Sequence, residues 1–229
     1  MKNLVTILMI LILVSCKTST GNDDNNIILG PENGTYDYYV GISYSGDQSN
    51  YPDTNYLYVI IANETDDEIE TIELKVDDET IALEYANYEG RVFYIAYFYL
   101  DVDDMLNVKL TVNEQQCQID VPTISVLNCT LPNDLQPNED ISINWTINED
   151  PQVIYVEGFQ FNSSNEIVGQ DGENLPADAR NFTIPADWLW SASNIDSRSI
   201  QVGITNFVVQ DRIAVVMSDG AYKNYVSNK

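Results

Sequence analysis

The sequence predicts an all-β protein that consists of two consecutive antiparallel β-sandwiches. After residue 30, apolar residues alternate with polar ones in short segments, and no long run has the periodicity of an amphipathic helix. Asn, Asp, Gly and Pro separate these segments, as is typical of turns between strands. The chain carries more such segments than one sandwich needs, so we expect two.

The clearest alternation lies in residues 106–112 and 141–147. In both segments every second residue is apolar and the residues between are polar, which is typical of half-buried antiparallel strands. Trp145 belongs to the apolar set, so we expect it in the core. Further strands are predicted at residues 36–45, 56–63, 69–76, 92–100, 117–121, 123–130, 153–161, 200–207 and 213–217.

Pro122 marks the predicted boundary between the two sandwiches, because it separates one apolar run from the next. We expect the first sandwich at residues 31–121 and the second at residues 122–229, each close to the usual size of about 100 residues. The first part holds 20 acidic and 3 basic residues, a net charge of -17, and the second holds 14 and 5, a net charge of -9. Because these charge densities differ, the two parts need not share a partner.

Two segments of the second part carry a distinctive aromatic pattern. Trp145 lies in the alternating run 140–147, and Tyr155 lies in the next apolar run; residues 182–189 read Phe-Thr-Ile-Pro-Ala-Asp-Trp-Leu. These segments resemble strands B, C and E of fibronectin type III and related Ig-like domains, with the corner that follows strand E. Residues 199–202 lack the tyrosine that this family places on strand F. The resemblance implies the sandwich architecture and no particular function.

The first 30 residues have the composition of an export signal and a tether. Lys2 precedes an apolar run over residues 4–14, which has the length of a signal-peptide core and is too short to span a bilayer. Residues 13–16, Leu-Val-Ser-Cys, resemble the lipobox of bacterial lipoproteins, in which the cysteine is acylated and becomes the first residue. The resemblance implies a signal peptide over residues 1–15 and attachment to the lipid bilayer through Cys16. Residues 16–30 contain few apolar residues, so we expect a flexible tether.

The residues that follow Cys16 indicate the destination. Lys17 does not resemble the aspartate that retains lipoproteins in the inner membrane, and Asp23 and Asp24 loosely resemble the surface-export signal of Bacteroidota lipoproteins. We therefore expect an outer-membrane lipoprotein of the Bacteroidota type, which faces either the periplasm or the cell surface.

Charge and the lack of histidine restrict the chemistry. The chain has 36 acidic residues, 10 basic residues and no histidine, a formal charge of -26. Such a surface repels phosphate, so we expect no nucleic-acid partner. Without histidine, the Ser/His and Cys/His nucleophile pairs and most zinc sites are excluded. No Gly-rich phosphate loop is present. We expect no catalytic residues and no cofactor.

Carboxylates offer the remaining route to catalysis. Two of them can hydrolyse a glycoside, and carboxylates in loops can bind calcium for a calcium-dependent hydrolase. Adjacent acidic residues are no more frequent here than chance predicts, and they lie in polar turns. The candidate calcium loops, residues 101–104 and 171–174, lack the ligand spacing of an EF-hand. We therefore expect no metal site.

Aromatic residues supply the candidate binding residues. Tyr51 lies beside Pro52 and Tyr88 lies near Gly90, so we expect both to be exposed at turns. Trp188 and Trp190 lie two residues apart, and in an extended segment both rings would point the same way. These four residues form the candidate ligand platform. The other tyrosines are expected in the core or in cross-strand pairs.

Cys117 and Cys129 are candidates for a disulfide, because an exported protein is exposed to oxidation. One continuous strand through Pro122 would hold them roughly 40 Å apart, whereas a reversal near Pro122 would allow the bond. Both alternatives stay open.

Together these observations predict a lipid-anchored envelope module that binds a glycan or a protein partner and performs no catalysis. The alternatives are a carboxylate-based or calcium-dependent hydrolase and a lipoprotein that serves as a structural spacer.

Overall fold

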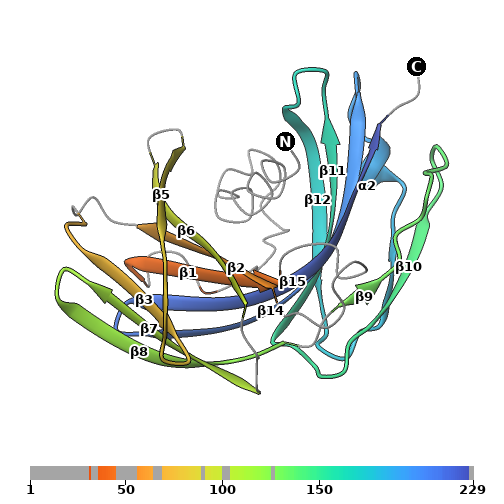
Figure 1. Cartoon of the computed structure of the whole chain (residues 1–229). Coiled ribbons are helices and arrows are strands. Elements are labelled where there is room, and N and C mark those ends of the chain that lie inside the picture. The colour runs from red at the N-terminus through yellow and green to blue at the C-terminus, as the bar shows by residue number, and fades with distance from the viewer. Residues whose placement is uncertain are drawn as a thin grey trace.

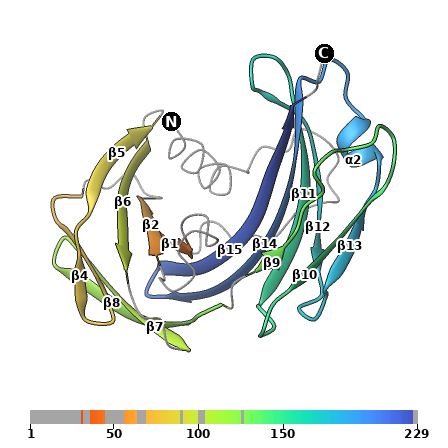
Figure 2. The ribbon, with the colours of Figure 1, turned by 45° about the vertical axis from the view of Figure 1, so that its right-hand side comes forward.

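The computed structural model describes residues 31, 36–44, 56–63, 69–88, 91–99, 104–124 and 127–226, and this part of the chain is all-β, as predicted. Its strands form sheets of eight, four and three strands. The eight-stranded sheet is strongly curved, and the two smaller sheets lie on its convex side, one toward each end (Figure 1, Figure 2). The predicted signal peptide, the tether with Cys16, and Tyr51 lie outside the described residues.

The first half of the chain forms two layers. One layer has the order β1-β2-β6-β5 and contains β1 (Tyr38–Tyr44), β2 (Tyr56–Asn63), β5 (Glu84–Tyr88) and β6 (Arg91–Tyr99). The other has the order β4-β3-β7-β8 and contains β3 (Ile72–Val76), β4 (Glu79–Ile81), β7 (Met105–Val112) and β8 (Gln115–Pro122). In Ig nomenclature these orders are ABED and C′CFG, so this half has an Ig-like β-sandwich topology.

The second half repeats this topology. Its smaller sheet has the order β13-β10-β9 and contains β9 (Asn128–Cys129), β10 (Ile141–Thr146) and β13 (Asn181–Ile184). The facing strands have the order β12-β11-β14-β15, with bounds β11 (Val153–Phe161), β12 (Ile167–Leu175), β14 (Ser197–Gln210) and β15 (Ile213–Val226). These orders correspond to EBA and C′CFG. Trp145 lies on the second strand and Tyr155 on the third, as the resemblance implies.

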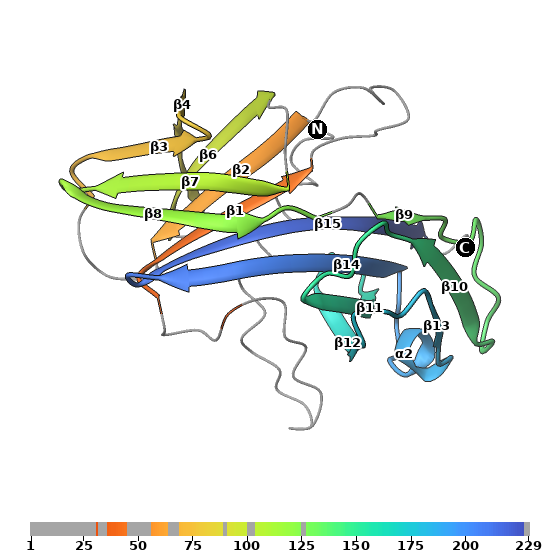
Figure 3. The same ribbon diagram turned by 90° about the horizontal axis from the view of Figure 1, so that it is seen from below.

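The β14–β15 hairpin joins the two halves. Each of its strands has 14 residues, and the tip of β15 pairs in parallel with β1, from Tyr38 opposite Ile213 to Ser43 opposite Ser218. At the tip, the Arg212 guanidinium forms an ion pair with Asp37, and the backbone N–H of Asp37 donates to the Arg212 carbonyl at 2.6 Å. The hairpin therefore extends the sheet of the second half into that of the first (Figure 3).

This pairing joins the sheets of the two halves, which the sequence analysis did not predict. The predicted boundary, Pro122, ends β8 and lies between the two sets of strands, yet the eight-stranded sheet runs across it. The predicted strands 200–207 and 213–217 are both longer in the structure, and the added residues of β14 supply part of the connection. The sequence analysis missed this because a strand pair that leaves its own sandwich has the same alternation as one that stays within it.

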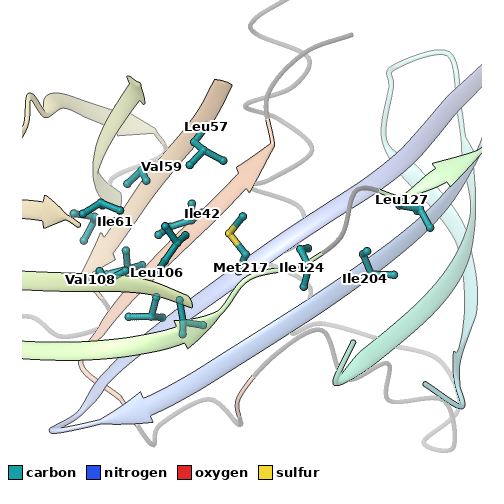
Figure 4. Packing of buried hydrophobic residues seen from close by; sticks show 14 of the residues in the cluster. Ile42, Leu57, Val59, Ile61, Leu106, Val108, Ile124, Leu127, Ile204 and Met217 are labelled. Atoms are coloured by element: carbon teal, nitrogen blue, oxygen red, sulfur yellow. The ribbon is translucent and has the colours of Figure 1, made fainter. Parts of the chain in front are cut away.

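The hydrophobic core is continuous across the two halves. One cluster contains Ile42, Val59 and Leu106 from the first half together with Ile204 and Met217 from the hairpin, and these lie side by side in Figure 4. Ile124 and Leu127, in the segment after β8, belong to the same cluster. Because the cluster has no gap at the boundary, we expect the two halves to unfold together.

Three hairpins close with two-residue turns in which both residues have positive φ. These turns are Asp77-Asp78 (φ 48° and 66°), Asn113-Glu114 (46° and 68°) and Asp211-Arg212 (48° and 62°). Such turns match the right-handed twist of the strands, and Asn and Asp tolerate them better than most residues. The acidic residues 77 and 78 are thus explained by the backbone conformation of this turn. The Asp77 carboxylate also accepts a hydrogen bond from the backbone N–H of Asn107 at 2.8 Å.

The predicted strands agree with the structure within a few residues, except that β15 continues from the predicted 213–217 to Val226 and that the segment 123–130 differs. Within residues 123–130, the described strand comprises only Asn128 and Cys129, so the predicted strand there is wrong for most of its length. Side chains hold this segment instead: the Asn206 amide donates to the Thr123 carbonyl, and Asp219 accepts from the Leu127 amide. The short strands β4 and β5 and the polar edge strand β12 were not predicted, because they lack a regular apolar alternation.

Candidate functional site

The concave side of the eight-stranded sheet is the side that neither smaller sheet covers (Figure 2). Residues opposite each other in paired strands point to the same side, so the register identifies the side chains on this face. We call them the inner face. Its main members are Tyr39, Gly41, Tyr58, Ile60, Ala62, Ala86, Phe93, Ile95 and Tyr97 in the first half, and Tyr155, Glu157, Phe159, Phe161, Gln170, Asn174, Ser199, Gln201, Gly203 and Tyr222 in the second.

The first half of the inner face is apolar and aromatic. Tyr58, Ile60, Ala62 and Phe93 form a buried cluster that is separate from the main core. The Tyr58 ring packs against Tyr97, with ring centroids 4.8 Å apart, and Tyr97 is 38% exposed. Burial, assisted by Tyr97, raises the pKa of Tyr58, so its hydroxyl stays protonated and can donate a hydrogen bond. This region therefore presents aromatic rings with few polar atoms.

The second half of the inner face is built around a buried carboxylate. Glu157 on β11 is 1% exposed, and its Oε1 accepts a hydrogen bond from the Gln170 amide of β12 at 3.0 Å. Burial raises the pKa of Glu157 to about 7, and the bond from Gln170 partly opposes this shift. Glu157 is therefore close to half protonated at neutral pH, which is unusual for a glutamate.

Tyrosine and amide side chains surround this carboxylate. Gln201 lies opposite Glu157 on β14, and its amide donates to the Tyr155 hydroxyl at 3.1 Å. Tyr222 lies opposite Gln201 on β15, and burial raises the pKa of its hydroxyl. Burial also raises the pKa of Tyr155, with a further contribution from Glu157. Glu157 thus lies among neutral groups that can form hydrogen bonds.

Several polar atoms of the inner face have no hydrogen-bond partner among the described residues. They are Oε2 of Glu157, Oδ1 of Asn174 and the hydroxyl oxygens of Tyr58 and Ser199. A buried polar atom without a partner costs about 1–3 kcal/mol, so it requires an explanation. No described strand or helix lies over the inner face (Figure 1, Figure 2). A bound ligand would supply the missing partners.

Glycines allow the tyrosine rings to lie along the sheet. A Cβ atom at Gly203 would lie 2.1 Å from Cζ of Tyr155, and one at Gly41 would lie 2.7 Å from Cε1 of Tyr39. Tyr39 on β1 is also one of the groups that raise the pKa of Tyr155 on β11. The aromatic surface therefore continues from the first half to the second.

The predicted ligand platform is not assembled in the structure. Trp188 and Trp190 lie in the short helix α2 (Asp187–Trp190), where residues two apart point to different sides, so the expected common direction is wrong. Trp188 is buried against Phe182, with ring centroids 5.5 Å apart, and Trp190 carries the Arg198 guanidinium 5.2 Å from its ring centroid. Tyr88 ends β5, but its side chain, like Tyr51, lies outside the described residues.

Trp145 is in the core as predicted, and its Nε1 donates to the Ala179 carbonyl at 3.0 Å.

The two cysteines of the described region are free thiols. Cys117 lies on β8, where its Sγ contacts the Gln210 carbonyl at 3.6 Å, and Cys129 lies on β9, opposite Trp145. They belong to different sheets, so of the two alternatives the structure has the one without the bond. Burial raises the pKa of Cys129 to about 11 and also raises the pKa of Cys117, so neither thiol is a reactive thiolate.

The acidic residues proposed as calcium ligands do not converge where they are described. Residues 171–174 lie within β12, so successive side chains point to opposite sides of the sheet. Residues 101–103 lie outside the described part of the chain. Within that part, no group of three or more Asp, Glu or Cys side chains is arranged to hold a metal ion.

Sequence reasoning did not find the inner-face residues. It predicted a strand at residues 153–161, and it assigned no role to Glu157, the single charged residue in that run. A charged residue inside an otherwise apolar strand is the signal that could have identified it. Nothing in the sequence distinguishes Gln201 and Gly203, because their role depends on the strands that pair with β14.

Comparisons with known proteins leave the chain without an assigned family. No protein-family model matches it, and no curated protein matches it. Among solved structures, the mouse nectin-like molecule 4 ectodomain (Ig1–Ig3) is 12% identical, with 84% of this chain and 63% of that chain covered and a TM-score of 0.22. Trypsin-activated alpha-2-macroglobulin from Escherichia coli is 11% identical, with 81% and 15% covered and a TM-score of 0.22. The Ig-like assignment thus depends on the strand orders.

Among the described residues, no helix is long and apolar enough to cross a membrane.

Proposed function

We propose that this chain is a lipid-anchored envelope protein that binds a glycan or a protein partner on its inner face and performs no catalysis. The observation that carries the proposal is the combination of aromatic rings with unpartnered buried polar atoms on one side of the eight-stranded sheet. Ligand sites of this kind combine a mostly apolar and aromatic lining with a few polar groups that orient the ligand. Tyrosine is also well suited to binding, because it offers a large rigid contact area together with a hydroxyl.

The anchor forms the second part of the proposal. Residues 13–16 resemble a lipobox, and acylation of Cys16 would tether the chain to the outer membrane of a Bacteroidota-type envelope. Replacing Cys16 by serine in the native host is expected to move the protein from the membrane fraction to the soluble fraction. A Cys16→Ser variant that still sediments with the outer membrane would contradict the proposed lipid anchor, but not the proposed binding at the inner face.

Crosslinking in intact cells tests the binding face. A photoreactive amino acid at Tyr97, which is 38% exposed on the inner face, is expected to capture a partner. The matched control carries the same amino acid at Glu73, an exposed residue of β3 in the four-stranded sheet. Glycan arrays probed with the purified protein cover the case of a carbohydrate ligand. If neither position captures a partner and the arrays are empty, the structural-spacer alternative replaces the proposal.

The hydrolase alternative has one observation in its favour, the raised pKa of Glu157. A carboxylate-based glycosidase needs a second carboxylate about 5–10 Å from the first. Burial raises the pKa of Glu157 while the hydrogen bond from Gln170 opposes the shift, and no other carboxylate of the described residues contributes to it. Binding therefore accounts for the described residues better than hydrolysis does.

A further inference from the structure

The environment of Glu157 indicates which chemistry the inner face recognises. Its Oε1 is bound by Gln170, while its Oε2 has no partner among the described residues. Asn174 Oδ1, on the neighbouring strand β12, also lacks a partner. Asn174 Oδ1 and the Oε2 of ionised Glu157 are both hydrogen-bond acceptors, so the partners that the ionised form lacks are donors. A ligand that fits here must bring N–H or O–H groups.

The negative charge of ionised Glu157 further restricts the class of ligand. An ionised carboxylate that is 1% exposed requires a counter-charge or several hydrogen bonds, and no described lysine or arginine forms an ion pair with Glu157. The basic side chains that the structure describes lie elsewhere: Lys75 pairs with Glu73, Arg180 with Asp150, Arg198 with the Leu189 carbonyl, Arg212 with Asp37 and Lys223 with Asn133, and Lys109 lies on β7 of the four-stranded sheet. The counter-charge for Glu157 therefore has to come from outside the described chain.

Aromatic rings flank the carboxylate on two sides. Tyr155 lies two residues before Glu157 on the same strand and face, a separation of about 7 Å along the strand. Tyr222 lies two strands away in the same cross-strand row, about 10 Å across the sheet. Rings at these positions can pack on a cation that is bound to the carboxylate, because the face of an aromatic ring attracts positive charge. The net charge of -26 also attracts cations to the protein.

We infer that the inner face binds a primary ammonium group, with Glu157 as its counter-ion, Asn174 as a further acceptor, and Tyr155 and Tyr222 as flanking rings. The ammonium could belong to an amino sugar or to a lysine side chain, and both would present the same charge and three N–H donors. This inference rests on the proposed binding function, since it specifies the ligand of the same face.

Calorimetric titration with matched pairs of small ligands tests the inference. One pair is a glucosamine oligosaccharide and its N-acetylated counterpart, and the other is Nα-acetyl-lysine amide and its Nε-acetylated form. Acetylation removes the charge and leaves the rest of each molecule intact. The amine of at least one pair is expected to bind about tenfold or more tightly than its acetylated form, because a charge-assisted hydrogen bond contributes about 1.5–3 kcal/mol. The pair that responds identifies the source of the ammonium.

Two variants distinguish the effect of Glu157 on binding from the effect of the protein's overall negative charge. Glu157→Gln keeps the shape of the side chain and should abolish the preference for the amine. Glu173 is an exposed residue of β12 that lies opposite Val156, so its side chain points to the other side of the sheet from Glu157. Glu173→Gln removes the same charge and should leave the preference for the amine unchanged. Circular dichroism would verify that both variants are folded. Equal effects of the two variants would overturn the inference, as would equal binding of amine and acetylated ligands. Tight binding of an acetylated ligand would still leave the proposed function in place.

Discussion

The two faces of the eight-stranded sheet are built from different residues, although both are buried. The convex face carries aliphatic residues such as Ile42, Val59 and Ile204, which pack against the two smaller sheets in one cluster. The inner face carries tyrosines, phenylalanines and a glutamate, and no described strand or helix lies over it. The comparison teaches that low exposure alone does not identify a core. Buried polar side chains of the convex face, such as Gln160 and Asn206, form hydrogen bonds, whereas the inner face retains polar atoms that have no partner among the described residues.

Ile42→Ala is expected to have the largest effect, because it removes core volume at the junction of the halves. Ile42 is fully buried on β1, which pairs with both β2 and β15. The loss should lower the free energy of unfolding by about 2–5 kcal/mol. Urea unfolding followed by tryptophan fluorescence would measure it, and all three tryptophans, Trp145, Trp188 and Trp190, lie in the second half. A tryptophan transition that does not shift would show that the halves unfold separately, contrary to the continuous core.

Glu157 is expected to make stability fall as pH rises. Its pKa is raised from 4.5 to about 7 in the folded protein, so between these values the folded state binds more protons than the unfolded state. The stability lost across this range should be on the order of 3 kcal/mol. Urea unfolding at several pH values would measure the slope. Glu157→Gln should flatten it above about pH 6, while the decrease of stability with rising pH should remain below about pH 6, because the pKa of Asp219 is raised from 3.8 to about 6. An unchanged slope above pH 6 would contradict this assignment.

Gly203→Ala is expected to displace the ring of Tyr155 from the inner face. The added Cβ would lie 2.1 Å from Cζ of Tyr155, and overpacking of this kind lowers stability by about 1–3 kcal/mol. The control is a double-mutant cycle with Tyr155→Leu, because the shorter side chain removes the clash. In the Tyr155→Leu background, Gly203→Ala should have much less effect on the urea midpoint. Equal effects in both backgrounds would mean that the glycine serves another purpose.

Arg212→Ala is expected to have the smallest effect. The guanidinium pairs with Asp37 at the tip of the β14–β15 hairpin, but the Arg212 side chain is largely exposed to solvent, where ion pairs contribute little. The backbone bond from Asp37 to the Arg212 carbonyl remains in the variant. The urea midpoint should change only within the error of the measurement. A clear loss of stability would show that the side chain, and not the core beneath the hairpin, holds the two halves together.

The sequence predicted the regular part of this fold, because alternation is a local property. Residues 106–112, 141–147 and 153–161 pair as strands where the pattern indicates them, and Trp145 lies in the core. The two-residue turns also follow from local chemistry, since Asn and Asp favour positive φ. The edge strand β12 escaped prediction because its pairing with β11 does not require an alternating apolar sequence.

The candidate platform failed because the local conformation of α2 was misjudged. A segment after a strand was taken as extended, whereas residues 187–190 form a helical turn that buries Trp188. Four residues are too few to show a helical period, so the sequence could not distinguish the two conformations. The direction of a tryptophan side chain depends on that choice.

By itself, the sequence determined the all-β class, the positions of most strands, the acidic charge and the absence of histidine chemistry. Only the tertiary structure decided that the β14–β15 hairpin reaches β1, and that Glu157, Tyr155 and Tyr222 share one face. The physical reason is that a strand's alternation specifies two faces but not which strand lies beside it. Register between distant segments comes from packing, and the inner face exists only once that register is formed.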